Sequence, residues 1–250
     1  MNMRENFLQN SENKEDLNRY LANKFMSLDL GSRAMVVTFG NSILTNDDSL
    51  LLEERINYCT SEEADARLVR HTIHCIEKGY NSIVVRTIDT DVVVLLISCK
   101  PYMDEVGTGN VYALMGKGKD LHYYDINAIS SKLGTDMCEG LPFFYAFTGC
   151  DTVSSMFNVS KCTFWDNLNL QKNLPDLLEI FKELSKQPLS LTSRQINLLE
   201  LFVLRVYYPK NPSPKGLNEE RLAHFKRQAV TNLRGLPFSK SGLAEHSKRA

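Results

Sequence analysis

Cysteine is sparse and scattered in this sequence, which argues against two kinds of stabilising site. The six cysteines never form a Cys-x-x-Cys pair; they are Cys59, Cys75, Cys99, Cys138, Cys150 and Cys162. Small secreted scaffolds are dense in cysteine, and structural zinc sites use closely spaced cysteine pairs. The sequence therefore predicts free thiols in a reducing compartment.

Long hydrophobic runs are also missing. The longest apolar run covers residues 92–97, far fewer than the roughly 20 residues that a helix needs to cross a bilayer. Residues 1–16 are polar and mixed in charge, so they lack the apolar core of a signal peptide and the Arg-rich, acid-poor character of a transit peptide. We therefore expect an intracellular protein, in the nucleus or the cytoplasm, with no membrane partner.

The two signs of charge are unevenly distributed along the chain. The net charge is only −1, yet residues 201–250 contain ten lysines and arginines against three glutamates, so the first 200 residues are net acidic. A basic tail behind an acidic body can hold a polyanion near a metal–carboxylate centre. Composition alone favours the ordinary alternative, a solvated surface of charged helices.

The stretch 83–97 is the feature around which the rest of the sequence is organised. An apolar run at 83–85 leads to Asp89-Thr90-Asp91, after which apolar residues resume at 92–97. Buried strands of parallel sheets are continuous Val, Ile and Leu runs, and ligands bind at their carboxyl ends. We therefore expect the two aspartates at a ligand-facing sheet edge, while residues 92–98 fit either a strand or a short buried helix.

Hydrophobic periodicity and turn residues predict an α/β architecture. A capping box at 60–63 begins a helix that Gly79 ends, and a strand at 83–88 follows closely, which is half of a βαβ unit. The other expected elements are a helix at 13–26, a strand at 35–39, a polar turn region at 41–49, a short strand at 56–59, a hairpin of strands 111–115 and 121–124 around 116–120, and helices at 127–133, 137–148, 174–185, 193–208 and 218–230. We expect three parts: an N-terminal helix at 1–29, an α/β core at 30–165 and a basic helical extension at 166–250.

Five acids fall where this architecture can gather them: Glu63, Asp65, Asp89, Asp91 and Asp151. The first two open a helix, the next two close a strand and the last follows an apolar helix, so all can share one edge of a parallel sheet. Carboxylates gathered there repel one another unless divalent cations neutralise them, and Mg²⁺ prefers such oxygen ligands together with substrate phosphates. Two ions about 3.5–4 Å apart can clamp the attacking and leaving oxygens of a phosphodiester displacement.

Each acid also has a purely structural explanation. Glu63 can complete the capping box, and Asp65 can favour the helix dipole. Asp89 and Asp91 can form a helix N-cap and a turn, and Asp151 can be an ordinary turn residue. Only the joint order of the acids therefore supports a metal site.

Three segments, in this order, resemble the successive acidic motifs of the flap-endonuclease branch of PIN-like nucleases: Ser61-Glu62-Glu63-Ala64-Asp65-Ala66, Asp89-Thr90-Asp91 and Phe147-Thr148-Gly149-Cys150-Asp151. The chain is still more similar to a group of uncharacterised animal PIN-like proteins associated with mobile elements. The resemblance implies a PIN-like Rossmannoid parallel sheet flanked by helices. It also implies Mg²⁺- or Mn²⁺-dependent hydrolysis of nucleic-acid phosphodiesters, with DNA as the expected partner and metal-held water as the nucleophile. The metal ligands and catalytic residues that it implies are Glu63, Asp65, Asp89, Asp91 and Asp151.

The sequence departs from this family at three places, of which one is its end at Lys248-Arg249-Ala250, where relatives continue, so a fragment or a decayed copy is expected. The family carries an aspartate on an earlier strand, often within Phe-Asp-Gly, and this sequence begins downstream of that point, so residues 1–29 are expected to be the remnant of a truncated N-terminal part. Where the family has a Gly-rich hairpin that grips the nucleic-acid backbone, this chain has Phe157-Asn158-Val159-Ser160-Lys161. This leaves Lys161 as the candidate nucleic-acid contact.

Two other functions stay open. The departures favour a noncatalytic PIN-like interaction protein or a decayed relic of a mobile element. The order Asp89-Thr90-Asp91-Val92-Val93 after a strand also matches the nucleophile motif of haloacid-dehalogenase-type phosphatases, in which Asp89 would form an aspartyl phosphate. We find no downstream lysine and acidic pair in the order of that family.

Overall fold

The computed structural model describes residues 9–40, 42–47, 50, 64–171, 174–186, 191–210, 215–227 and 235–250. The chain divides into two compact units, Met1–His74 and Cys75–Ala250, which are described in turn. Helix α4 (Ala64–Glu77) contains the point of division.

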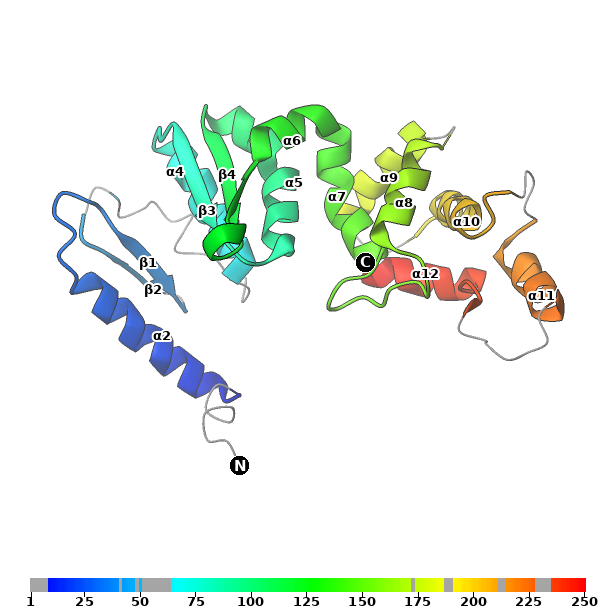
Figure 1. The fold of residues 1–250 in the computed structure, drawn as a ribbon, viewed down its shortest axis with the longest axis horizontal. Helices are drawn as coiled ribbons and strands as arrows, with labels where there is room; N and C mark the ends of the chain where they lie inside the picture. The colour runs from blue at the N-terminus through cyan, green and yellow to red at the C-terminus, as the bar shows by residue number, and fades with distance from the viewer. Residues whose placement is uncertain are drawn as a thin grey trace. The chain divides into compact units, whose positions relative to one another are not determined.

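The first unit contains a helix that packs beside a two-stranded hairpin (Figure 1). Helix α2 (Ser11–Met26) is capped by Asn10 and agrees with the predicted helix. Strand β1 (Val36–Phe39) pairs antiparallel with β2 (Ser42–Thr45). The prediction of β1 is confirmed. The prediction of a polar turn region at 41–49 is wrong at β2, because the apolar pair at the centre of β2 belongs to the second strand of the hairpin.

Helix α4 places His71 against the hairpin of the same unit. Nε2 of His71 lies 3.0 Å from Oγ1 of Thr38 in β1. Burial lowers the pKa of His71, and the Arg67 guanidinium lowers it further, so the imidazole is neutral near pH 7. Gly79 has φ +80° and follows the last turn of α4, as the sequence predicted. The strand expected at 56–59 and the capping box at 60–63 lie outside the described residues.

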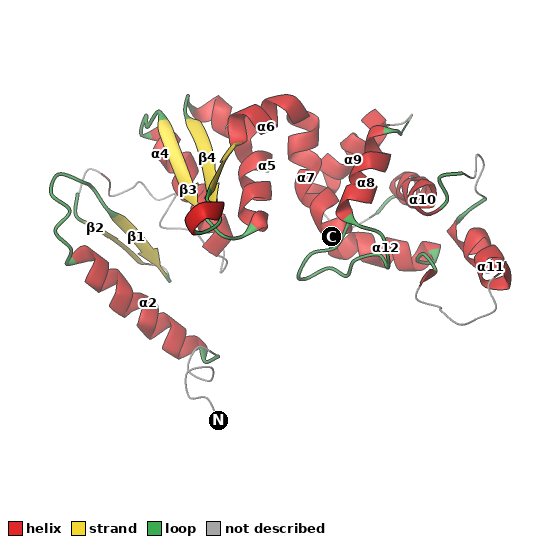
Figure 2. Ribbon diagram, in the orientation of Figure 1, coloured by secondary structure: helices red, strands yellow, loops and turns green. Residues whose placement is uncertain are grey.

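The second unit begins with a three-stranded mixed sheet (Figure 2). Strand β3 (Ser82–Arg86) pairs parallel with β4 (Asn110–Met115), and α5 (Thr90–Val106) connects them as the crossover of a βαβ unit. Strand β5 (His122–Asp125) then returns antiparallel to β4, which confirms the predicted hairpin. A short 3₁₀ turn, η2 (Gly118–Asp120), lies between the two strands.

Burial alternates along β3, so this strand is covered on one face. Ile83 and Val85 are buried, whereas Val84 is 50% exposed. The apolar run had suggested a strand buried on both faces, and among the described residues only one face is covered.

Residues 92–98, which the sequence left open between strand and helix, form part of α5. The β-branched residues there suit both structures, but Asp89 supplies an N-cap. Val92 and Leu96, one helical turn apart, are fully buried, so the apolar run forms the inner face of this helix.

The remaining regular elements of the described second unit are helices. They are α6 (Ile126–Leu133), α7 (Thr135–Phe147), α8 (Lys161–Asn169), α9 (Leu174–Lys186), α10 (Ser193–Tyr207), α11 (Leu217–Arg227) and α12 (Lys240–Arg249). The helices expected near α6, α7, α9, α10 and α11 are confirmed, whereas α8 and α12 were not predicted.

Aromatic side chains from four of these helices form one core. Its fully buried members are Phe143, Phe147, Phe164, Phe181 and Phe202. Neighbouring ring centroids in this core are 5.5–6.5 Å apart, within the usual range for interacting aromatic pairs. This core fixes the last turn of α7, from which the candidate site is built.

The architecture is thus α/β with a small mixed sheet and a helical C-terminal part, and the predicted domain boundaries at 29 and 165 remain predictions. Across the described ranges, no helix is both long and apolar enough to span a bilayer.

Candidate functional site

Asp89 lies where β3 leads into α5, and local hydrogen bonds hold it there. Its backbone N–H donates to Oγ1 of Thr87 at 3.0 Å, and its Oδ1 accepts the backbone N–H of Asp91 at 2.9 Å. Asp89 is therefore the N-cap of α5, which was the structural alternative for this residue. A helix N-terminus favours negative charge, so the same ionised carboxylate can cap α5 and serve as a metal ligand.

Asp91 lies in the first turn of α5 and is held by a residue that the sequence did not single out. The Tyr145 hydroxyl, on α7, donates to Oδ1 of Asp91 at 2.7 Å. The Thr90 hydroxyl lies 3.1 Å from the same phenolic oxygen. Because the phenol has one proton and gives it to Asp91, Thr90 is the donor in the second contact.

The phenol of Tyr145 keeps its proton at neutral pH. Burial raises the pKa of Tyr145 above its ordinary value of 10, and the carboxylates of Asp91 and Asp89 raise it further, while the Thr90 hydrogen bond opposes this. Tyr145 therefore remains a hydrogen-bond donor to Asp91 over the whole physiological range of pH.

Lys161, the first residue of α8, lies against the end of α7. Its ammonium donates to the carbonyl oxygen of Tyr145 at 2.7 Å, to Oγ1 of Thr148 at 3.2 Å and to the carbonyl oxygen of Gly149. Its Nζ also lies 3.8 Å from the centroid of the Tyr145 ring. Burial lowers the pKa of Lys161, and the negative charge of Asp91 opposes this.

These contacts bear on the expected role of Lys161. An ammonium has three N–H donors, and all three have acceptors within the second unit. A contact between Lys161 and a phosphate stays a prediction, and it would act through charge rather than through a spare hydrogen-bond donor.

Asp151 lies on a tight turn directly after α7. Gly149 has φ +105°, and a Cβ at this position would lie 2.6 Å from Cα of Ser155, so only glycine fits. The backbone N–H of Cys150 donates to the carbonyl oxygen of Val153 at 2.9 Å, which closes the turn. The side chain of Asp151 is exposed there.

The predicted acids are distributed over both units. Asp89, Asp91 and Asp151 belong to the second unit, and Asp65 lies in the first turn of α4, in the first unit. Glu63 lies outside the described residues. Within the described ranges, no three His, Cys, Asp or Glu side chains come together to hold a metal ion. The five-carboxylate centre therefore remains a prediction.

The two carboxylates at the start of α5 suit a metal site with fewer protein ligands. Mg²⁺ is commonly held by one or two carboxylates, with water and substrate phosphate completing its coordination. Asp89 and Asp91 each use Oδ1 in a hydrogen bond, which leaves one carboxylate oxygen of each without a hydrogen-bond partner among the described residues. The donor chemistry of this pair therefore suits a hard divalent cation.

No protein-family model, curated protein or solved structure matches this chain. The candidate site is therefore defined by its own geometry and by the residues at the start of α5 and the end of α7.

Tyr145 is the functional candidate that sequence reasoning missed. It is the polar member of Phe143-Phe144-Tyr145-Ala146-Phe147, and a hydroxyl within so apolar a helix needs a partner when it is buried. That local pattern could have marked it as paired. The identity of the partner, 54 positions earlier in the chain, follows only from the packing of α7 on α5.

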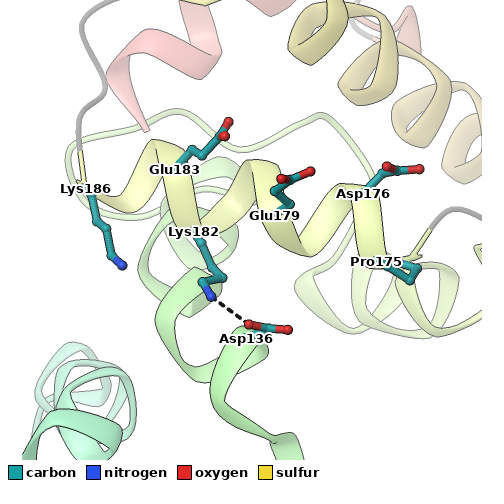
Figure 3. Close-up of a pocket in the computed structure, with 7 residues that line it drawn as sticks. All are labelled: Asp136, Pro175, Asp176, Glu179, Lys182, Glu183 and Lys186. Atoms are coloured by element: carbon teal, nitrogen blue, oxygen red, sulfur yellow. Dashed lines mark hydrogen bonds and ion pairs between the residues drawn. The ribbon is translucent and has the colours of Figure 1, made fainter.

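A second polar feature is the groove between α7 and α9 (Figure 3). Its lining is charged and its volume is about 460 Å³; it consists of Asp136, Pro175, Asp176, Glu179, Lys182, Glu183 and Lys186. Lys182 points to Asp136, with Nζ 2.6 Å from Oδ1, and Lys186 pairs with Glu139 at 2.9 Å. Lys182 and Lys186 thus join α9 to α7, whereas Asp176 and Glu179 pair with Arg194 on α10.

Proposed function

We propose that this chain is a Mg²⁺- or Mn²⁺-dependent nuclease of the PIN-like, flap-endonuclease type, acting on nucleic acid and on DNA in the first instance. The observation that carries the proposal is the Asp89 and Asp91 pair, which lies at the end of a βαβ strand with one unengaged oxygen on each carboxylate among the described residues. Ligand sites of open α/β sheets lie at this edge.

In this proposal each residue has a defined part. Asp89 and Asp91 would hold the cation, with Asp151, Asp65 and Glu63 as further candidate ligands. When bound, a divalent cation lowers the pKa of its water and neutralises phosphate charge. No protein side chain needs to act as the nucleophile, because the attacking group is water. The Tyr145 hydroxyl keeps the Asp91 carboxylate in one orientation.

A second candidate is a noncatalytic interaction protein with the same fold. Two observations favour it: the described residues contain no group of three metal-binding side chains, and the three donors of Lys161 are used within the chain. A chain of this kind would bind a partner without cutting it.

The experiment compares the chain with its Asp89→Asn variant on branched and single-stranded DNA and RNA, with Mn²⁺ or Mg²⁺ and with a chelator. Asparagine caps a helix about as well as aspartate, so the variant keeps α5 and loses only the charge. We expect cleavage by the chain, and only background cleavage by the variant or in the presence of chelator.

The other outcomes separate the alternatives. Equal background cleavage by both proteins would contradict the nuclease proposal and support the noncatalytic one. A phosphoryl group trapped covalently on Asp89 would instead support the phosphatase alternative.

A further inference from the structure

We infer that Tyr145 and Lys161 act as one positioning unit, which fixes the orientation of the Asp91 carboxylate and the conformation of the 149–151 turn together. The effect that we expect on metal binding rests on the proposed function, whereas the geometric link between Asp91 and the 149–151 turn does not. Neither residue needs to contact the substrate, so both are positioning residues.

The first step is the contact between α5 and α7. A carboxylate in the first turn of a helix can rotate unless a partner holds it, and the Tyr145 hydroxyl holds Oδ1 of Asp91 at 2.7 Å. The Thr90 hydroxyl, 3.1 Å from the phenolic oxygen, restricts the phenol in turn. Oδ2 of Asp91 is thereby left in a defined direction for another ligand.

The second step joins the phenol to Lys161. Lys161 touches Tyr145 twice, since its Nζ bonds the Tyr145 carbonyl oxygen at 2.7 Å and lies 3.8 Å from the ring centroid. A cation over an aromatic face and at a helix C-terminus is favourable on both counts. The ammonium therefore restrains the backbone and the ring of Tyr145 together.

The third step extends to the turn that carries Asp151. The carbonyl oxygen of Gly149 accepts from the same ammonium, and Thr148 does so through its hydroxyl at 3.2 Å. The end of a helix leaves carbonyl groups without intrahelical partners, and Lys161 bonds one of these, the carbonyl of Tyr145. One cation thus connects the orientation of Asp91 to the position of the 149–151 turn.

The test uses Tyr145→Phe and Lys161→Met in the full chain, with Tyr123→Phe and Lys119→Met as matched controls at exposed positions. The first variant removes one hydroxyl and keeps the ring, and the second removes the charge and keeps the aliphatic stem. Mn²⁺ affinity, thermal midpoint and backbone hydrogen exchange at 89–91 and 149–153 are measured for each protein.

We expect Tyr145→Phe to weaken Mn²⁺ binding by about tenfold or more, as the loss of an outer hydrogen-bond partner does at metal sites. We expect Lys161→Met to speed exchange at 149–153 by about tenfold or more, because hydrogen bonds to a charged group are lost. The two controls should match the parent chain. A merely structural Tyr145 would lower the thermal midpoint and leave Mn²⁺ affinity unchanged.

The outcomes distinguish this inference from the proposed function. If the parent chain binds Mn²⁺ and Tyr145→Phe binds it equally well, the positioning inference is overturned and the proposed function stands. If the parent chain binds no Mn²⁺, the proposed function is overturned, and hydrogen exchange decides the inference. Faster exchange at both segments in Tyr145→Phe then supports it, and unchanged exchange overturns it. Tyr145→Phe alone suffices for this decision should Lys161→Met fail to fold.

Discussion

Asp89 both caps α5 and carries a charge, and substitution can separate these two properties. Its Oδ1 accepts the Asp91 backbone N–H at 2.9 Å. We expect Asp89→Ala to lower the free energy of unfolding by about 1 kcal/mol, and Asp89→Asn to change it much less, because asparagine also caps helices. Denaturant titration of the three proteins measures this, and equal losses in both variants would contradict the capping role.

Gly149 determines whether the turn that carries Asp151 can form. We expect Gly149→Ala to cost about 1–3 kcal/mol of stability, because its φ of +105° disfavours a side chain and the new Cβ would lie 2.6 Å from Ser155. Gly118→Ala is the matched control, since Gly118 has φ +57° and a Cβ added there would have no described atom within 4 Å. Urea unfolding should show the larger loss for Gly149→Ala; the reverse order would mean that the turn adapts.

His246 makes stability depend on pH near neutrality. Its Nε2 lies 2.8 Å from the carbonyl oxygen of Phe147, and burial lowers its pKa from the ordinary value of 6.5, with Arg249 adding to the effect and the Phe147 hydrogen bond opposing it. The stability that neutral His246 provides is fully present above about pH 6.5 and is lost as the pH falls toward the lower folded-state pKa.

The variant His246→Phe isolates this contribution. We expect the parent chain to lose more unfolding free energy than the variant between pH 8 and pH 5, as measured by urea titration at both pH values. His71 shifts in the same direction and is present in both proteins, so it cancels in the comparison. Equal losses would show that His246 does not carry the dependence.

At the scale of elements, we expect close packing between α7 and α9 to contribute more to stability than the ion pairs in the groove between them. A Cβ on Gly140 would lie 2.8 Å from Cβ of Phe181, so we expect Gly140→Ala to cost about 1–3 kcal/mol through overpacking. Lys182→Met removes pairs with Asp136 and Glu139, one of them exposed, and should cost about 0–1 kcal/mol. Thermal unfolding of both variants tests this order.

Elements with strong local signals were predictable from the sequence. Gly79 marks the end of α4, and the glycines around 116–120 mark the hairpin of β4 and β5. Strand β2 has four residues, and α8 and α12 have nine and ten, so they offer only short windows in which periodicity is a weak guide. The form of α5 was undecided because β-branched runs suit strands and buried helices alike.

At the candidate site, too, some features follow from neighbouring residues in the sequence, whereas others depend on contacts between distant segments. The proximity of Asp89 and Asp91 follows from their spacing, and so could be predicted. The contact of Asp91 with Tyr145, and that of Lys161 with the end of α7, depend on how helices pack. No pattern within a few residues of Asp91 could reveal them.

Across the whole molecule, part of the C-terminal positive charge is already used within the chain. Lys240 pairs with Glu200 at 2.7 Å, and Lys248 pairs with Glu245 at 2.6 Å. The pair with Glu200 therefore neutralises one positive charge beyond those that the glutamates of residues 201–250 already balance, while the pair with Glu245 lies within that balance.

The last helix also affects the region before Asp151. The His246 ring contacts the rings of Phe147 and Phe238, with centroids 5.4 Å and 4.8 Å away, and it bonds the carbonyl oxygen of Phe147. A substitution in α12 can therefore shift the last turn of α7 and, with it, the turn that carries Asp151. Suppressor mutations that restore a chain damaged in the last turn of α7 should accordingly be sought in the C-terminal helix.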